Sequence, residues 1–272
     1  MDIPLRRLAS VAAAAIAASL AVVLAACSTP AGTQARPPDP PPPVRQQEVS
    51  ATERANLHAE LGAGYYERGQ MDIALEELKL AESLDPSNPK IFNVYGLVYA
   101  MLGDNAKAEQ NFQRALALAP QDSEIRHNWG WYLCTTGRMR ESIPEFEQAL
   151  RNPLYRTPEI ALVNAGRCSA AFGDIAGAEA YFKRAQAMAP NNPGANYGLA
   201  LLAYRAGRHD EARGWIRRLL LQPNPAPEAL YLGMCVERKS GDRTAEASFV
   251  AQLRNRYPDT AETRAIATGT CE

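Results

Sequence analysis

Six glycines recur along this chain at almost constant intervals, and this spacing constrains the fold more than any other feature. They are Gly69, Gly103, Gly137, Gly173, Gly207 and Gly241, separated by 34, 34, 36, 34 and 34 residues. Glycine readily takes the left-handed backbone conformation in which many α-helices end. A period of this length predicts a stack of similar helical units, each burying its apolar face only against its neighbours.

Other residues of each unit follow the same period. Small residues lie seven positions before the first five glycines, at Gly62, Gly96, Gly130, Gly166 and Ala200. Small residues also lie five positions after them, at Ala74, Ala108, Ser142, Ala178 and Ala212. Bulky residues follow four positions later, at Leu78, Phe112, Phe146, Phe182 and Ile216. Small residues let two helices approach closely, and the bulky residue fills the space beside them.

This pattern resembles the tetratricopeptide repeat, a helix-turn-helix unit. The resemblance implies an all-α fold, a right-handed α-solenoid of six tetratricopeptide repeats with a short C-terminal capping helix. We place the repeats at residues 55–88, 89–122, 123–158, 159–192, 193–226 and 227–258, and the cap and tail at 259–272. The third repeat has two extra residues near the prolines at 153 and 158, which we interpret as a tolerated loop insertion.

The N-terminus has the layout of a secretory leader. Arg6 and Arg7 precede an alanine-rich apolar run over residues 8–26, and the run ends in the sequence LAAC. This ending resembles the bacterial lipobox, in which a peptidase cuts before a lipid-modified cysteine. We therefore expect residues 1–26 to be a cleaved lipoprotein signal peptide and Cys27 to carry the lipid. An uncleaved anchor helix and an ordinary leader are the alternatives.

The segment after Cys27 is rich in proline. Residues 28–50 contain seven prolines and almost no apolar side chain. Such a segment cannot bury a core, so we expect residues 27–54 to form a lipidated, disordered tether. Serine at position 28, by analogy with known lipoproteins, favours transfer to the outer membrane. The expected location is the periplasmic face of the bacterial outer membrane.

Four cysteines remain once Cys27 carries lipid, and the periplasm is an oxidising compartment. Cys134 and Cys168 fall at similar positions in the first helices of two consecutive repeats. First helices of neighbouring repeats pack side by side, so we predict a disulfide between these two; two separate buried thiols are the alternative. Cys235 and Cys271 have a comparable separation, but the sequence leaves their pairing undecided.

The sequence contains no recognisable motif that combines residues for catalysis. The three histidines are isolated, and neither paired zinc-ligand spacing nor a glycine-rich nucleotide loop occurs. His127 and Cys134 could share a helix face, but no third catalytic group accompanies them. With 29 basic and 30 acidic residues, the chain has no excess positive charge for nucleic acid. We therefore predict a non-enzymatic binding protein without metal, cofactor, nucleic acid or small-molecule substrate.

The expected working surface is the concave groove lined by the first helix of each repeat. In this architecture positions 2, 5, 9 and 12 of that helix point into the groove. The predicted lining is Asn93, Leu97, His127, Trp131, Arg167, Tyr197, Leu201, Tyr204 and Tyr231. This apolar and aromatic lining suits an extended or helical apolar peptide. The alternative is that Trp131 and Leu97 merely pack against the next helix.

One segment is more specific than the repeats. The stretch NWGWYLCTTGR…NPLYRTPEIALVNAGRCSAAFGD, with its two cysteines and two-residue insertion, resembles the type IV pilus biogenesis and stability lipoproteins called PilF or PilW. The resemblance implies a pilotin that supports assembly of the pilus secretin in the outer membrane, and hence twitching motility. The expected partner is the secretin or another pilus-assembly protein. The alternative is a different envelope scaffold lipoprotein, serving outer-membrane protein assembly or peptidoglycan enzymes.

Overall fold

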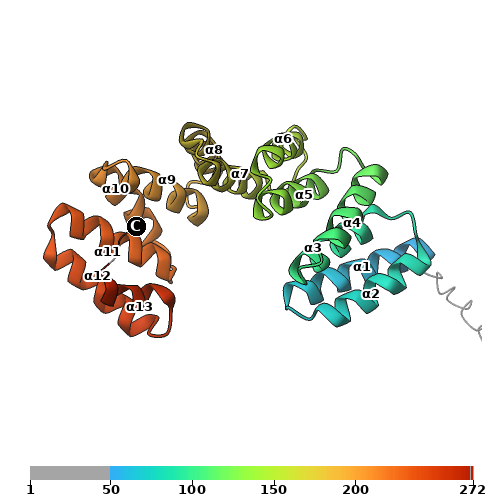
Figure 1. The fold of residues 1–272 in the computed structure, drawn as a ribbon, viewed down its shortest axis with the longest axis horizontal. Coiled ribbons are helices and arrows are strands. Elements are labelled where there is room, and N and C mark those ends of the chain that lie inside the picture. The colour runs from blue at the N-terminus through green and yellow to red at the C-terminus, as the bar shows by residue number, and fades with distance from the viewer. Residues whose placement is uncertain (1–49, 270, 272) are drawn as a thin grey trace, which may run out of the picture. The chain divides into compact units, whose positions relative to one another are not determined.

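The computed structural model describes residues 50–269 and residue 271, which belong to a compact unit spanning Glu48–Glu272. These residues form thirteen α-helices and no strand (Figure 1). The helices are α1 (Ala51–Glu67), α2 (Met71–Leu84), α3 (Pro89–Met101), α4 (Asn105–Leu118), α5 (Ser123–Thr135), α6 (Met139–Leu150), α7 (Pro158–Phe172), α8 (Ile175–Met188), α9 (Pro193–Arg205), α10 (His209–Leu219), α11 (Pro227–Ser240), α12 (Arg243–Arg256) and α13 (Ala261–Thr268). The predicted signal peptide, the lipidation site Cys27 and residues 28–49 of the tether lie outside the described residues.

The helices pack in consecutive pairs, from α1 with α2 to α11 with α12. The first helix of each pair also contacts the first helix of the next pair, so α1, α3, α5, α7, α9 and α11 form one continuous row. The prediction of an all-α solenoid built from six helix-turn-helix units is confirmed.

The periodic glycines end the first helix of each pair, as predicted. All six have positive φ, between 73° and 92°. Gly173 and Gly241 are the C-cap residues of α7 and α11, and the other four directly follow a C-cap. No atom lies within 4 Å of a Cβ built at any of the six. The left-handed backbone, rather than crowding, is therefore what favours glycine at these positions.

Helix α1 begins earlier than the sequence predicts. The tether was expected to extend to residue 54, but α1 starts at Ala51. The reason is a capping box: the Ser50 side chain accepts from the Glu53 backbone N–H, and the Glu53 carboxylate accepts from the Ser50 backbone N–H. These two bonds satisfy free donors of the first turn, so residues 51–54 are helical.

The small and bulky residues of the period meet in the core. A Cβ added at Gly96 would lie 2.8 Å from the ring of Phe112, and one at Gly166 would lie 2.7 Å from the ring of Phe182. Both rings are almost completely buried. Phe182 also lies against Gly198 of the next repeat, where an added Cβ would come within 2.5 Å of the ring. The bulky residue thus joins two consecutive repeats, and burying such a ring contributes about 2–3 kcal/mol.

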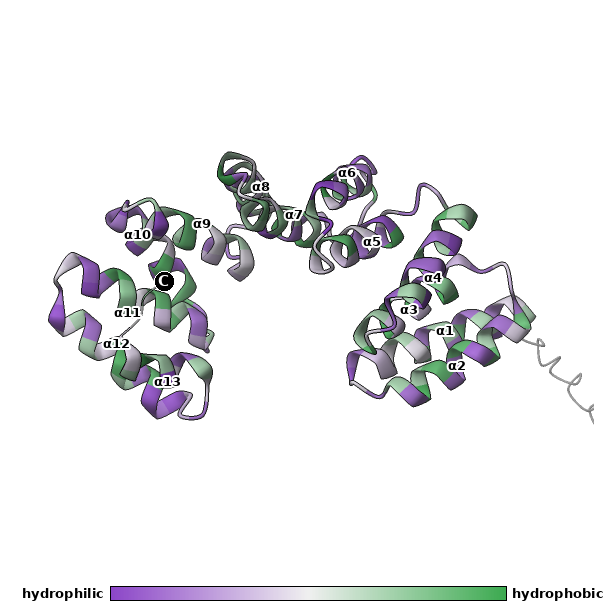
Figure 2. Ribbon diagram, viewed as in Figure 1, coloured by the Kyte–Doolittle hydropathy of each residue, from purple (hydrophilic) through white to green (hydrophobic). Residues whose placement is uncertain are grey.

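The apolar core is divided among several clusters along the row of repeats. One contains Phe112, Trp129 and Tyr132, and another contains Phe146, Ala161 and Cys168. In Figure 2 hydrophobic and hydrophilic residues alternate along most helices, which is the pattern of helices with one buried face. Stability therefore arises mainly from contacts within a repeat and between neighbours.

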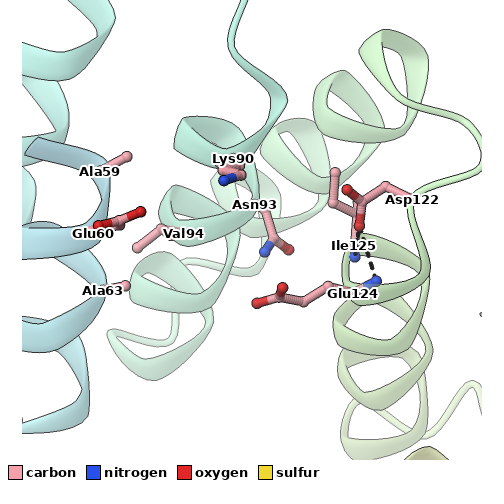
Figure 3. A pocket seen from close by; sticks show the side chains of 9 residues that line it. All are labelled: Ala59, Glu60, Ala63, Lys90, Asn93, Val94, Asp122, Glu124 and Ile125. Carbon is pink, nitrogen blue, oxygen red and sulfur yellow. Dashed lines mark hydrogen bonds between the residues drawn. The ribbon is translucent and has the colours of Figure 1, made fainter. Parts of the chain in front are cut away.

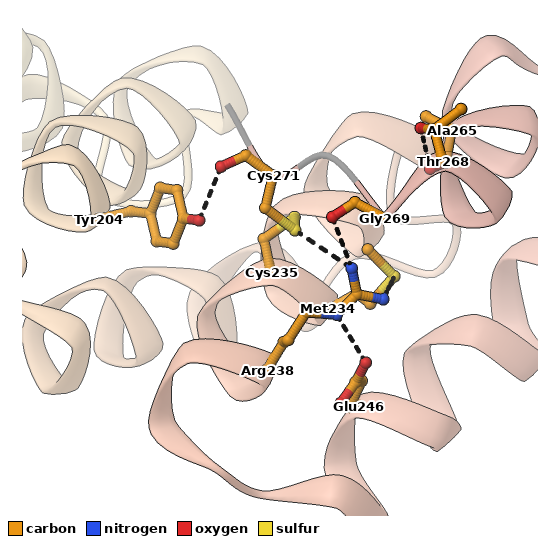
Figure 4. The surroundings of a disulfide bond; sticks show 9 residues. All are labelled: Tyr204, Met234, Cys235, Arg238, Glu246, Ala265, Thr268, Gly269 and Cys271. Carbon is orange, nitrogen blue, oxygen red and sulfur yellow. Dashed lines mark hydrogen bonds and ion pairs between the residues drawn. A yellow bond between two sulfur atoms is a disulfide. The ribbon is translucent and has the colours of Figure 1, made fainter.

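The C-terminal end is covered by α13, which contacts both α11 and α12. Beyond α13, Cys271 is bonded to Cys235 of α11 (Figure 4). The Tyr204 hydroxyl donates to the Cys271 carbonyl at 3.0 Å, and the Arg238 guanidinium donates to the Gly269 carbonyl at 3.0 Å. The pairing that the sequence left undecided is present, and the tail is held against repeats five and six.

Candidate partner-binding face

We define the helix-A face as the exposed side of the row α1, α3, α5, α7, α9 and α11. The nine predicted lining residues all belong to these helices. Arg167 is exposed, while Leu97, Trp131, Tyr197, Leu201 and Tyr231 are partly buried. Trp131 packs against the cluster around Phe146, and Leu97 packs against the cluster around Phe112. Both side chains therefore contribute to the core as well as to the surface.

Asn93 is buried and contributes to the contact between two repeats. Its exposed fraction is only 5%, and its side-chain oxygen accepts from the Asn128 amide of α5 at 3.2 Å. A second amide pair lies one repeat earlier, where Asn88 donates to Asn56 at 2.8 Å. Such amide pairs between first helices satisfy buried polar groups and fix the register of neighbouring repeats.

The partly buried His127, another predicted lining residue, makes hydrogen bonds within the chain. Its Nδ1 lies 2.8 Å from the Tyr155 hydroxyl, in the inserted loop, and its Nε2 lies 2.8 Å from the Asn164 amide of α7. Because the amide nitrogen can only donate, Nε2 is the acceptor and Nδ1 carries the proton. Burial lowers the pKa of His127 from 6.5 to about 4, so the ring is neutral at pH 7. Both ring nitrogens are used within the chain.

Tyr204 departs from its predicted role. Its ring is 8% exposed, and its hydroxyl bonds to the backbone of the C-terminal tail. The sequence placed Tyr204 on the groove side of its helix without including the tail that covers it. The polar atoms of Tyr204 and His127 are thus occupied within the protein.

The disulfide between Cys134 and Cys168 joins α5 to α7, across the junction that carries the insertion. Their Cα atoms are 5.9 Å apart, and Cys168 is fully buried. The cross-link and the hydrogen bond from the Asn164 amide to His127 connect the same two helices. This part of the face is held by covalent and polar contacts in addition to apolar packing.

The first hollow of the helix-A face lies along α1, α3 and α5, and we call it the acidic hollow. Its volume is about 220 Å³, and Figure 3 shows its lining of Ala59, Glu60, Ala63, Lys90, Asn93, Val94, Asp122, Glu124 and Ile125. Three carboxylates accompany one ammonium group. Asp122 is occupied as the N-cap of α5, where it accepts from the backbone of Glu124 and Ile125. Glu60, Lys90 and Glu124 are exposed.

A second hollow lies between α7 and α9, and we call it the arginine hollow. Its volume is about 420 Å³, and its lining is Arg167, Ala170, Ala171, Phe182, Gly194, Tyr197, Gly198, Leu201, Leu202 and Arg205. A further cavity of about 650 Å³ shares Arg167, Gly194 and Tyr197 and continues to the start of α11. Burial raises the pKa of Tyr197, and the negative charges of Glu228 and Glu262 add to that rise, whereas the positive charges of Arg205 and Arg167 oppose it. Both guanidinium groups therefore act on the same hollow.

The sequence analysis predicted only some of the residues that line these two hollows. Lys90 and Glu124 occupy position 2 of their helices, so the same positional rule could have found them. Arg205 lies at position 13, outside that rule, and only the packing of α9 on α7 shows that it borders the hollow. The predicted residues Arg167, Tyr197 and Leu201 do come together there.

Within the described part of the chain, no three histidine, cysteine, aspartate or glutamate side chains are grouped as metal ligands. Over the same residues, no helix has the length and hydropathy needed to cross a bilayer.

Comparison with known proteins agrees with this architecture. Tetratricopeptide repeat families match residues 62–103, 89–122, 127–193 and 169–232. The crystal structure of PilW, described as a widely conserved type IV pilus biogenesis factor, is 32% identical, with a TM-score of 0.71 over 78% of this chain and 98% of that chain.

Two further comparisons concern Pseudomonas aeruginosa. Its type IV pilus assembly protein PilF is 25% identical over 210 residues, which is 77% of this chain and 83% of PilF. The solved structure of PilF from the same species has a TM-score of 0.71 at 24% identity, covering 81% of this chain and 99% of that chain. The chain therefore belongs to the PilF and PilW family of tetratricopeptide repeat proteins of type IV pilus biogenesis.

Proposed function

We propose that this protein is an outer-membrane lipoprotein that acts as a pilotin, or assembly factor, for the secretin of the type IV pilus. The observation that carries the proposal is its similarity to PilW, which extends over 98% of the PilW chain. The lipobox ending at Cys27 supports the lipoprotein part of the proposal. In this proposal the lipid determines the location, and the helix-A face binds a segment of the secretin or of another pilus-assembly protein.

The physical roles of the parts are distinct. Two or three acyl chains on Cys27 give stable membrane attachment, whereas a single chain would bind only marginally. The proline-rich segment after Cys27 separates the repeats from the bilayer. The repeats then present a preorganised surface, because the disulfide between Cys134 and Cys168 and the amide pairs restrict motion between neighbouring repeats. This division of roles requires no catalytic step, and we propose that the protein is not an enzyme.

The test is deletion of the gene in the native organism, followed by measurement of secretin multimers in outer-membrane fractions and of twitching motility. We expect both to fall sharply and to recover when the wild-type chain is supplied. Unchanged multimers with normal motility would contradict the pilotin role. That result would favour the alternative of another envelope scaffold lipoprotein.

A second experiment isolates the contribution of the lipid. The variant Cys27→Ala should retain the helix content of the repeats but be released from the outer membrane, and secretin assembly should weaken. The matched control is Ser28→Ala, which leaves the lipidated cysteine in place and should behave as wild type. Full secretin assembly by Cys27→Ala at native protein level would show that the lipid is not part of the mechanism.

A further inference from the structure

Two arginines at the rim of the arginine hollow have no partner within the described part of the chain. Arg167 of α7 and Arg205 of α9 are both exposed, and neither makes an ion pair or a hydrogen bond there. Arginines on the second helices of the same repeats behave differently. Arg184 pairs with Glu147 at 3.0 Å, and Arg213 pairs with Glu237 at 2.7 Å. The unpaired guanidinium groups are therefore available to a ligand.

The hollow between these arginines has a largely apolar wall that includes four small residues. Ala170 and Ala171 line its α7 side, and Gly194 and Gly198 line its α9 side. A Cβ at Gly194 would lie 2.8 Å from Val163, and one at Gly198 would lie 2.5 Å from Phe182. An added methyl group at either position would collide with a side chain already in place, so both glycines allow α9 to pack closely against Val163 and Phe182 beside the hollow.

The remaining lining of the hollow consists of Phe182, Tyr197, Leu201 and Leu202. A cavity of about 420 Å³ with this lining accepts a large apolar side chain. A guanidinium group binds a carboxylate with two parallel, charge-assisted hydrogen bonds. The combination of an apolar cavity with two unpaired guanidinium groups is complementary to one kind of peptide.

We propose that the arginine hollow anchors a partner peptide in which a large apolar side chain lies next to a carboxylate. The apolar side chain enters between α7 and α9, and Arg167 and Arg205 bind the carboxylate. The carboxylate is that of an aspartate or glutamate side chain within the peptide. This inference rests on the proposed function in one respect, the binding of a partner segment by the helix-A face.

The acidic hollow provides an internal contrast. Glu60 and Glu124 are exposed there, with Lys90 as the single cation in the lining. A peptide with a carboxylate beside its apolar residue is repelled by that end of the face and attracted by the other. The arginine hollow therefore favours acidic peptide segments, whereas the acidic hollow disfavours them.

The test is an array of synthetic peptides probed with the full mature chain in detergent. Each peptide has twelve residues with a central leucine, phenylalanine or tryptophan, flanked by aspartate or glutamate, by asparagine or glutamine, or by lysine. A further set carries the apolar residue at a free or an amidated C-terminus. We expect the peptides with aspartate or glutamate to bind at least tenfold more tightly than their uncharged counterparts, and a preference confined to the free C-terminus would contradict the proposal. These two sets distinguish the sources of the carboxylate.

Substitution of the two arginines tests whether the acidic peptides bind at the arginine hollow. Arg167→Ala with Arg205→Ala should reduce binding of the acidic peptides at least tenfold, measured by fluorescence anisotropy on the strongest of them. Arg254→Ala is the matched control, because Arg254 of α12 is also exposed and unpaired among the described residues but lies outside the hollow. Circular dichroism should show unchanged helix content in every variant.

The proposal is overturned if the acidic peptides bind no better than the uncharged ones, or if their binding survives loss of both arginines. Its outcome is separable from that of the pilotin proposal, which is measured in cells by secretin multimers. If acidic peptides bind through the arginines but the deletion strain has normal secretin multimers, the arginine hollow is supported as a binding site and the pilotin role is contradicted. If the deletion strain loses its secretin multimers but the acidic peptides show no preference, the pilotin role is supported and the peptide-binding site is contradicted.

Discussion

The buried histidine at the junction of repeats three and four should make the stability of this protein dependent on pH. The pKa of His127 is lowered from 6.5 to about 4 because the ring is buried. In the unfolded chain the ring takes up a proton near pH 6.5, whereas in the folded chain it does so only near pH 4. The stabilising contribution is therefore fully present above about pH 6.5 and is lost as the pH falls toward 4.

The magnitude follows from the two pKa values. At pH 5 the unfolded chain is almost fully protonated at this position and the folded chain is almost neutral. The linkage relation then gives a loss of about 2 kcal/mol relative to pH 7.5, and about 3 kcal/mol over the whole window. The hydrogen bond from the Asn164 amide to Nε2 opposes protonation as well, because a protonated Nε2 can no longer accept.

The assay is urea unfolding at pH 7.5 and pH 5, for the wild type and for His127→Phe. The variant keeps an aromatic ring but does not titrate, so its loss of stability between the two pH values should be smaller by about 2 kcal/mol. Tyr155→Phe is the matched control: it removes the hydroxyl bonded to Nδ1 but keeps His127 buried, and should retain most of the pH dependence. Equal losses in wild type and His127→Phe, or an NMR titration of His127 near pH 6.5, would refute the reasoning.

The other predictions concern repeat packing and the C-terminal tail. Gly198→Ala should destabilise the chain by about 1–3 kcal/mol in urea, because its Cβ would lie 2.5 Å from Phe182. Gly214→Ala in α10 has no atom within 4 Å of the added Cβ, so it should stabilise by up to about 1 kcal/mol; a loss equal to that of Gly198→Ala would contradict the crowding argument. Cys271→Ser opens a cross-link between positions 36 apart and should cost up to about 3–4 kcal/mol, seen as faster hydrogen exchange in α11 and α13; unchanged exchange would show that the tail contacts alone hold this end.

Much of the fold was predictable because its signals are local. Helix ends at Gly69 and its five counterparts require a left-handed backbone, which depends on the residue itself and not on distant contacts. The regular period also relates equivalent positions in consecutive repeats, which is why Cys134 and Cys168 were expected to face each other. The start of α1 was misplaced because the repeat period places the first unit at residue 55, whereas the capping box of Ser50 and Glu53 starts the helix at Ala51.

The candidate site was less predictable than the fold. The repeat period indicates on which side of its own helix a residue lies, and this brought Arg167, Tyr197 and Leu201 correctly to one hollow. It does not say which other segments cover that side. His127 is hydrogen-bonded to the inserted loop and to α7, and Tyr204 is hydrogen-bonded to the C-terminal tail at Cys271.

The sequence by itself determined the number of repeats, the ends of their first helices and the pairing of small with bulky core residues. Only the tertiary structure decided which groove residues remain free, where the hollows lie and which arginines lack a partner. The physical reason is that a helix end depends on neighbouring residues in the chain, whereas exposure and ion pairing depend on atoms contributed by other repeats, by an insertion and by the C-terminal tail.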